Sequence, residues 1–305
     1  MAAPEAVLAI FGPTGVGKTS VAIELAERLR ADGEHPVAIS ADALQVYRGL
    51  EVLTGVATPA QQERLEHRLV SFLPVTETFS AGQFAALAHE EIDAALAAGR
   101  RPIVVGGTGL YLQAALTDLD LRPPPPPGVR ERILAEADER GVEALHAELA
   151  ERAPSAAATI EPTDRTRVVR ALELLEMGED PAPGGEDSRL WTAELRRPAV
   201  LAGLTMERER LYEQIDARVD AMIEAGAEEE VRRAHAAGAS PTARKALGFE
   251  ELLRGDVEAM KRRTRNYAKR QLTWMRRLER ANVLDGRDDA ADRLHRLVKE
   301  EEKDL

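Results

Sequence analysis

The stretch Gly12-Pro13-Thr14-Gly15-Val16-Gly17-Lys18-Thr19 decides the fold of this chain. It matches the pattern G-x-x-x-x-G-K-[ST], follows the apolar run 7–11 and precedes a segment, 20–30, whose apolar residues recur at helical spacing. A glycine loop between a strand and a helix lets backbone N–H groups and the positive end of the helix dipole converge on a phosphate. The lysine neutralises the outer oxygens, and the threonine hydroxyl can hold Mg²⁺. We therefore predict a polyphosphate site here, the alternative being glycines that only make a tight turn.

The overall composition is that of a globular protein, with 44% apolar and 31% charged residues among 305. There is no cysteine, which excludes disulfides and thiolate zinc sites. No apolar run approaches the roughly 20 residues of a membrane span and the first residues lack signal-peptide features, so we expect a cytoplasmic protein. The formal charge of −12 argues against nucleic-acid binding over the whole surface, but a local basic face can coexist with it.

A candidate acid follows the second predicted strand, 36–40, at Asp42. Ligands of open α/β sheets bind beyond the carboxyl ends of the strands, so Asp42 should face the phosphate loop. An equally good interpretation of this residue alone is a helix cap, since Asp is a preferred N-cap. The third strand, 101–105, ends in Gly106-Gly107-Thr108-Gly109, where many phosphate-loop NTPases carry an Asp that holds Mg²⁺. This glycine ending weakens an ATPase interpretation.

The rest of the chain predicts an α/β core interrupted by helices. Five prolines at 123–127 cannot form a helix or a central strand and mark a boundary. Further predicted elements are a strand at 67–73, a helix at 83–98, helical segments at 129–152, 155–158 and 165–177, an exposed loop at 178–188, and strands at 199–204 and 282–284. We therefore expect a P-loop NTPase-like three-layer α/β core with a parallel sheet in residues 1–121 and 198–305. Residues 122–197 should form an all-helical insertion domain.

Residues 261–280 carry an unusual density of cations. They contain nine Lys or Arg and one acid, interleaved with Tyr267 and Trp274. Such a density on a helix repels itself unless an anion compensates it, and aromatic rings offer stacking surfaces for bases. We favour nucleic acid as that anion; the alternative is a basic face paired with the chain's own acids. In 207–233, a predicted helix pair, cations alternate with acids and should be solvated.

These features together resemble one family, the tRNA dimethylallyltransferases (tRNA isopentenyltransferases, or IPP transferases), over nearly the whole chain. Besides the phosphate loop, the resemblance rests on Ile39-Ser40-Ala41-Asp42 with Gln45-Val46-Tyr47-Arg48-Gly49, Val105-Gly106-Gly107-Thr108-Gly109-Leu110-Tyr111, Pro162-Thr163-Asp164 with Arg167 and Arg170-Ala171-Leu172-Glu173, Ala243-Arg244-Lys245-Ala246-Leu247-Gly248-Phe249-Glu250-Glu251, and Thr264-Arg265-Asn266-Tyr267-Ala268-Lys269-Arg270-Gln271-Leu272-Thr273-Trp274. The last block is long and specific.

The chain departs from the family pattern at three places. Asp42-Ala43 stands where Asp-Ser is usual, and Leu53-Thr54-Gly55-Val56 where Gly-Thr-Ala-Lys is usual, so an expected lysine is missing. Gln214 stands where an arginine is common, although Arg218 one turn later is kept. These departures concern details of substrate contact near Thr54 and Gln214.

The resemblance implies transfer of a dimethylallyl group from dimethylallyl diphosphate to the exocyclic amine of the adenosine 3′-adjacent to a tRNA anticodon, with release of diphosphate. It implies a monomeric prenyltransferase that uses Mg²⁺ held by Thr19, binds the diphosphate at Gly12–Thr19 and has Lys18, Thr19, Asp42 and Arg218 as catalytic residues, with Asp42 as general base. The implied tRNA contacts, including the grip of the insertion on the anticodon arm, are Asp42, Ala43, Leu44, Gln45, Thr108, Arg130, Thr166, Arg167, Arg170, Arg244, Gly248, Arg265, Lys269, Arg270, Gln271 and Trp274.

Two other classes remain to be weighed. A small-molecule kinase with this sheet also has an Asp after the second strand and glycines after the third, but it does not need the basic helix or the large insertion. A non-catalytic RNA-binding protein with a relic phosphate loop conflicts with the intact Lys18-Thr19 and Asp42.

Overall fold

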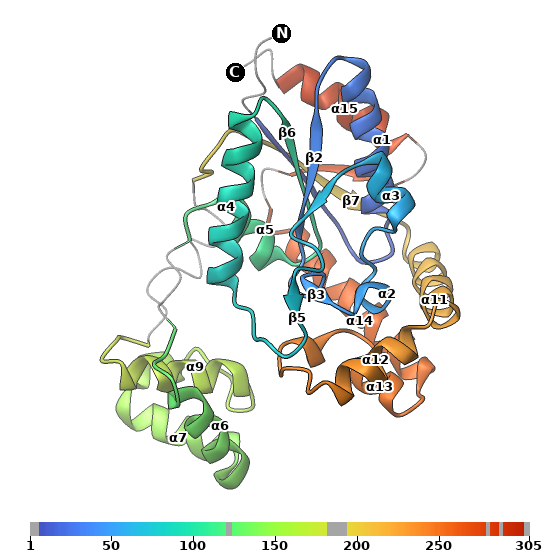
Figure 1. The fold of residues 1–305 in the computed structure, drawn as a ribbon. Helices are drawn as coiled ribbons and strands as arrows, with labels where there is room; N and C mark the ends of the chain where they lie inside the picture. Colours follow the sequence, from blue (N-terminus) through green and yellow to red (C-terminus); the bar gives the residue numbers. More distant parts are fainter. Residues whose placement is uncertain (1–5, 120–123, 182–193, 279–280, 287–288, 302–305) are drawn as a thin grey trace. The chain divides into compact units, whose positions relative to one another are not determined.

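The computed structural model describes residues 6–119, 124–181, 194–278, 281–286 and 289–301, and the chain divides into two compact units (Figure 1). The core unit contains residues 1–119 and 193–305, and the helical unit contains residues 120–192. Residues 195–197 thus lie with the core unit, where Leu195 bridges Thr117 and the Arg196 N–H donates to Leu116 O at 2.9 Å.

The core unit is organised around a six-stranded sheet in which every neighbouring pair is parallel, in the order β4-β2-β6-β1-β7-β8. The strands are β1 (Val7–Phe11), β2 (Pro36–Ala41), β4 (His67–Arg68), β6 (Arg101–Gly106), β7 (Ala199–Thr205) and β8 (Asn282–Asp285). β1 and β2 are buried along their whole length, as expected for parallel strands covered on both faces. The predicted parallel α/β core is therefore confirmed.

Helices cover both faces of this sheet and make it the middle of three layers (Figure 1). On one face α1 (Lys18–Ala31) and α15 (Ala290–Glu301) pack over Leu8, Ile10 and Ile103. On the other face lie α4 (Ala81–Ala97) and α5 (Gly109–Leu116), which contact β2 and β6. Because successive strand residues point to opposite faces, an almost continuous apolar run in each central strand serves both layers.

The remaining helices of the core unit gather beside the loops that follow the strands. They are α2 (Glu51–Thr54), α3 (Pro59–Arg64), α11 (Arg208–Glu224), α12 (Ala227–Ala236), α13 (Phe249–Leu253), α14 (Val257–Met275) and the 3₁₀ turn Ala243–Lys245. In Figure 1, α12, α13 and α14 lie at the lower end of this unit. α14 packs on α11 and on α5, and α5 in turn contacts β6, β1 and β2.

The predicted strand at 67–73 is wrong in its extent. The segment contains β4, which pairs with β2 in the main sheet, and β5 (Leu73–Pro74), which pairs in parallel with β3 (Tyr47–Arg48) in a separate two-stranded sheet. Leu69 and Ser71 between them have φ of 59° and 49°, a left-handed conformation that ends an extended strand. The apolar composition of the segment gave no sign of this break.

The helical unit consists of α6 (Val129–Arg140), α7 (Val142–Arg152), α8 (Pro154–Ala157) and α9 (Arg165–Glu176). Its core includes Ile133, Leu145, Leu149, Val168 and Leu172. The helical pattern at 129–152 is divided into α6 and α7 by Gly141, whose φ of 84° no helix accommodates. Of the predicted loop at 178–188, residues from 182 onward lie outside the described residues, as does Pro123 of the proline run.

Candidate active site

The predicted phosphate loop lies between the carboxyl end of β1 and the first turn of α1. Gly15 and Gly17 have φ of 85° and 93°, a conformation that L side chains rarely adopt, and Gly15 packs against Ile215 of α11. Lys18 Nζ donates to Gly12 O and to Pro13 O, both at 2.9 Å. The loop thus has the glycine conformations and helix terminus of an anion cradle, with its lysine folded back onto the loop.

Lys18 has an unusual electrostatic environment. Burial, followed by the nearby charge of Arg218, lowers the pKa of Lys18 to about 7, and Asp42 only partly offsets these effects. Burial also lowers the pKa of the half-buried Arg218 of α11, again with a partial offset from Asp42. Two cations that repel each other and are poorly hydrated favour an anion between them.

Asp42 follows β2 and faces the same region. Its Oδ1 accepts from the Leu44 N–H at 2.9 Å, within a turn rather than at the start of a helix, since the next helix, α2, begins at Glu51. Its charge also raises the pKa of Tyr267 to about 12, after burial as the main cause, and contributes to the raised pKa of Tyr111. Asp42 is therefore a turn-forming carboxylate that acts electrostatically on four groups of the site, and the helix-cap interpretation is wrong.

The glycines after β6 allow three loops to meet. A Cβ on Gly106 would lie 2.4 Å from Ala41 O of β2, and one on Gly107 would lie 2.2 Å from Nε2 of Gln271 and 3.0 Å from Gly12 O. Any side chain at either position would therefore separate the loops that follow β1, β2 and β6. This explains in physical terms why glycine stands where other phosphate-loop proteins carry an acid.

Two polar residues of α14 point inward to these loops. Gln271 is only 2% exposed; its Oε1 accepts from the Thr14 N–H at 2.8 Å and its Nε2 donates to Gly107 O at 2.7 Å. Tyr267, one turn earlier, shares a hydrogen bond of 2.9 Å with the Thr108 hydroxyl. This arrangement argues against the predicted role of Gln271 as an RNA contact.

The predicted basic stretch divides into two halves. Towards the start of α14, Lys261, Arg263 and Arg265 form ion pairs with Asp220, Glu251 and Asp216 on neighbouring helices, at 2.7, 2.9 and 2.5 Å. Towards its end, no acid among the described residues pairs with Lys269, Arg270 or Arg276, all of which are exposed. The alternative of an internal ion-pair face is therefore correct for Lys261, Arg263 and Arg265, whereas Lys269, Arg270 and Arg276 remain available to an external anion.

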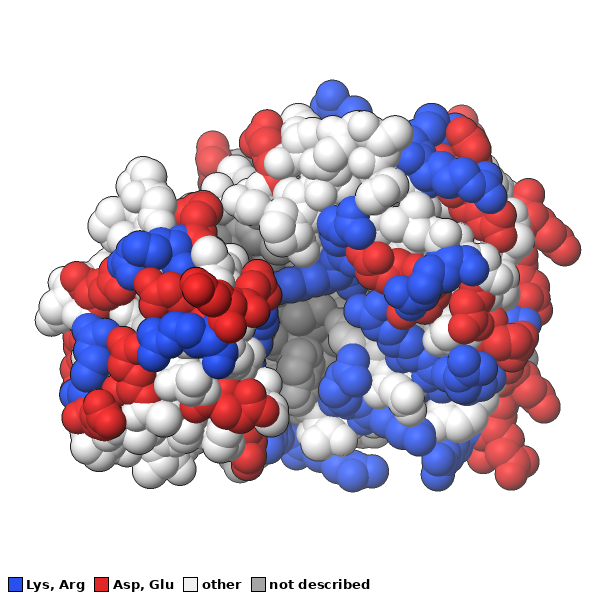
Figure 2. Space-filling model, turned by 90° about the horizontal axis from the view of Figure 1, so that it is seen from below, with Lys and Arg blue, Asp and Glu red and all other residues white. Residues whose placement is uncertain are grey.

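Charges on the core unit are unevenly distributed in the view from below. Figure 2 shows Lys and Arg crowded over the lower part of this unit, with Asp and Glu along its right margin. Arg270 lies over the Tyr267 ring at 5.4 Å from its centroid and is exposed. A local basic face thus coexists with the net charge of −12.

Several other predicted RNA contacts in the core unit are engaged internally. The Gln45 amide accepts from Ser40 Oγ and donates to Gly55 O, at 2.8 and 3.1 Å. Gly248 is buried, and a Cβ there would lie 2.5 Å from Met260 Sδ. Arg244 forms an ion pair of 2.7 Å with Glu250. Ala43, Leu44, Thr108 and Trp274 are half-buried. Gln45 and Gly248 therefore shape the protein, which argues against direct RNA contact by either.

In the helical unit the predicted RNA contacts surround one buried acid. Glu173 is fully buried, with Arg130 at 2.5 Å and Arg170 at 2.9 Å from its oxygens. Thr166 and Arg167 are exposed at the start of α9, where Arg167 pairs loosely, at 3.5 Å, with the cap residue Asp164. Glu173 thus fixes two arginines that stay partly accessible, since the side chains of Arg130 and Arg170 are 52% and 27% exposed.

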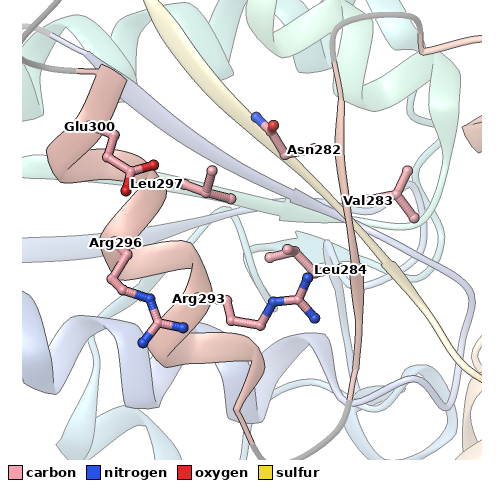
Figure 3. Close-up of a pocket in the computed structure, with 7 residues that line it drawn as sticks. All are labelled: Asn282, Val283, Leu284, Arg293, Arg296, Leu297 and Glu300. Atoms are coloured by element: carbon pink, nitrogen blue, oxygen red, sulfur yellow. The ribbon is translucent and has the colours of Figure 1, made fainter.

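A pocket of about 310 Å³ lies elsewhere, between β8 and α15 (Figure 3). It is lined by Asn282, Val283, Leu284, Arg293, Arg296, Leu297 and Glu300. None of these residues belongs to the phosphate-loop region. Among the described residues, no helix is long and apolar enough to cross a membrane.

The parallel sheet and the glycine loop with its lysine define a phosphate-loop α/β protein. The sequence profile of the IPP transferase family matches residues 45–278. The chain is 40% identical to a tRNA dimethylallyltransferase of Thermobifida fusca over 96% of this chain and 94% of that protein. The structure resembles the full-length tRNA isopentenylpyrophosphate transferase of Bacillus halodurans (TM-score 0.69, 32% identity, 99% and 98% coverage) and a eukaryotic dimethylallyltransferase acting on tRNA (TM-score 0.75, 27% identity, 93% and 75% coverage). This chain belongs to the IPP transferase family, as its motifs predicted.

The sequence did not indicate that two tyrosines lie within the electrostatic influence of Asp42. Tyr111 of α5 and Tyr267 of α14 are both influenced by the charge of Asp42, and Tyr267 was assigned to base stacking instead. The available signal was the spacing of Tyr267 and Gln271, four residues apart, which places both on one helix face.

Proposed function

We propose that this protein is a tRNA dimethylallyltransferase that transfers the dimethylallyl group of dimethylallyl diphosphate to the exocyclic amine of the adenosine 3′-adjacent to the anticodon. The observation that carries the proposal is the convergence of Lys18, Asp42 and Arg218 beside a phosphate cradle at the carboxyl ends of β1 and β2. Membership of the IPP transferase family supports the choice of donor and acceptor.

The cradle would stabilise the leaving group. As the allylic C–O bond breaks, its electron pair passes to the diphosphate, and negative charge grows on that oxygen. This charge would be bound by N–H groups of the loop Gly12–Thr19 at the start of α1 and by the cations of Lys18 and Arg218; the convergence of the two cations supports this assignment. Since Lys18 loses hydration in this site, an incoming anion would favour its protonated form.

Asp42 would act as the general base. The adenine amine is a poor nucleophile because its lone pair is delocalised into the ring, so removal of its proton must accompany formation of the N–C bond. The carboxylate of Asp42 is anchored by the Leu44 N–H through one oxygen, Oδ1. Its second oxygen would take the proton, and diphosphate leaves with the electron pair of the broken bond.

Mg²⁺ would be held by the Thr19 hydroxyl in the first turn of α1. Mg²⁺ commonly takes one or two protein ligands and completes its octahedron with phosphate oxygens and water. The position of Thr19 suits this mode, because it is the second residue of α1 and directly follows the lysine of the phosphate loop. The ion would supply charge neutralisation for the diphosphate.

The tRNA would bind on two surfaces. On the core unit we assign it to the end of α14, with Lys269, Arg270 and Trp274, together with Thr108 and the turn residues Asp42, Ala43 and Leu44 around the entrance. On the helical unit we assign the anticodon arm to Thr166, Arg167, Arg130 and Arg170. We expect the protein to act as a monomer. To reach Asp42, the target base must leave its stack, as in other enzymes that act on a base.

The decisive experiment is to measure diphosphate release from dimethylallyl diphosphate with and without an anticodon stem-loop. We expect release only when both substrates and Mg²⁺ are present. The kinase alternative, which no comparison supports, predicts instead that ATP stabilises the fold and is consumed while the allylic diphosphate does neither.

A further inference from the structure

Gln271 is the one residue of α14 whose side chain bonds to the phosphate loop among the contacts of the described residues. Its amide oxygen holds the Thr14 N–H at 2.8 Å and its amide nitrogen holds Gly107 O at 2.7 Å. These two loops are separated by about a hundred residues in the chain and follow adjacent strands, β1 and β6. One side chain therefore bridges the cradle and the glycine loop beside it.

The side chain of Gln271 is buried and closely packed. It is 2% exposed, and the gap it fills is set by glycine: a Cβ on Gly107 would lie 2.2 Å from Nε2. On the same face and one turn earlier, Tyr267 bonds the Thr108 hydroxyl at 2.9 Å. The inner face of α14 thus grips the loop after β6 at two successive residues, Gly107 and Thr108.

The outer face of the same helical turns carries exposed cations, Lys269 and Arg270. With the RNA surface proposed above, one helix would carry RNA-binding cations outside and loop-binding groups inside, and would so connect the two substrate sites physically. This connection does not require any residue of α14 to touch the diphosphate.

We propose that Gln271 is a positioning residue that sets the conformation of the phosphate loop for the diphosphate, rather than a contact for RNA. The proposal rests on the function proposed above, because it takes the loop Gly12–Thr19 as the diphosphate site. Without the Gln271 amide, the Thr14 N–H and Gly107 O lose their hydrogen-bond partners. Binding of diphosphate then has to order the loop as well, and the free energy spent on this ordering lowers the affinity for diphosphate.

The test compares Gln271→Met, which keeps the length and volume of the side chain and removes both hydrogen bonds, with the parent. We expect inorganic diphosphate, measured by titration calorimetry with Mg²⁺, to bind about tenfold or more weakly, since the variant loses two buried hydrogen bonds. KM for dimethylallyl diphosphate should rise by a similar factor. The affinity for an anticodon stem-loop should stay within about twofold of the parent and keep its salt dependence.

Thr264→Val is the matched control. Thr264 lies on the same helix, is 6% exposed and uses its hydroxyl within the helix, on Met260 O at 2.8 Å. It should bind diphosphate like the parent even if its melting temperature falls, which separates loop positioning from a general loss of stability. Should Gln271→Met not fold, Gln271→Asn decides, because its amide is one methylene too short to hold both loops.

Normal diphosphate binding by a folded Gln271 variant would overturn the proposal. So would a variant that loses RNA affinity while its diphosphate affinity is unchanged, because Gln271 would then be an RNA contact. If the parent itself fails to bind diphosphate, the proposed function fails instead, and the two failures are distinct.

Discussion

Arg218 lies directly against Gly55: a methyl group built on Gly55 would stand 1.8 Å from Nη2 and 2.9 Å from Cζ of the guanidinium. Gly55 belongs to the stretch Leu53-Thr54-Gly55-Val56, where the family usually has Gly-Thr-Ala-Lys, and its φ is 65°. The family usually carries alanine at the position of Gly55. In this chain the guanidinium of Arg218, from α11, fills the space where the alanine methyl group would stand. The departure at Gly55 thus affects where Arg218 lies rather than whether it is present.

Gly55→Ala should displace Arg218 and lower kcat for dimethylallyl transfer by about tenfold or more, because one cation of the diphosphate site moves. Affinity for the stem-loop should not change. The control is Gly49→Ala, which has a comparable φ of 88° but no described atom within 4 Å of the added methyl. Equal effects of both substitutions would mean that backbone strain, not Arg218, is responsible.

The lowered pKa of Lys18, about 7, gives diphosphate binding a pH dependence. A bound anion raises this pKa, so between pH 7 and 9 binding takes up a proton at Lys18 and affinity falls as the pH rises. Calorimetry in two buffers of different ionisation enthalpy measures this uptake. Lys18→Met should abolish it, and uptake that persists in this variant would place the titrating group elsewhere.

Folding stability without ligand should show the opposite trend for the same group. The unfolded lysine, near its ordinary value of 10.5, binds a proton that the folded form releases above about pH 7. Its contribution therefore favours folding increasingly from pH 7 towards 10. Comparing the melting temperatures of the parent and Lys18→Met over this range isolates the contribution of Lys18.

Asp42→Asn should reduce turnover by about 10²–10⁴-fold, since it removes the base and keeps the shape and the acceptor for the Leu44 N–H. Binding of the stem-loop should change little. Asp256→Asn is a suitable comparison, because Asp256 also accepts from a backbone N–H, that of Ala259 at 2.8 Å, but caps α14. Near-normal turnover of the Asp42 variant would mean that the base is another group.

Salt dependence should separate the two halves of the basic stretch. Lys269→Ala and Arg270→Ala should weaken stem-loop binding and flatten its log–log salt dependence by roughly one unit or less each. Arg265→Ala should instead lower the melting temperature with little change in salt slope, because it breaks the half-buried pair with Asp216. Filter binding from about 50 to 200 mM salt, together with thermal unfolding, tests both expectations. A reduced slope for Arg265→Ala alone would reverse the assignment.

Local sequence patterns predicted those parts of the fold and of the site that depend on residues adjacent in the chain. The glycine loop with its strand and helix, and the buried apolar runs of the sheet, were identified because each carries its own periodicity. The break at Leu69 and Ser71 and the pairing of Arg265 with Asp216 were not, since the first depends on backbone angles and the second on a partner 49 residues away. Counting cations along α14 could not reveal which of them face acids of α11 and α13.

Two carbonyl groups of the phosphate loop, those of Gly12 and Pro13, accept hydrogen bonds from the ammonium group of Lys18 in the same loop. An anion that enters the loop has to draw the ammonium group of Lys18 away from both carbonyl oxygens before it can pair with its positive charge. A monophosphate has fewer charges and fewer oxygens with which to do so than a diphosphate. If the proposed diphosphate site is correct, the loop would therefore discriminate against inorganic phosphate, because the two hydrogen bonds of Lys18 to its own backbone must break whichever anion enters.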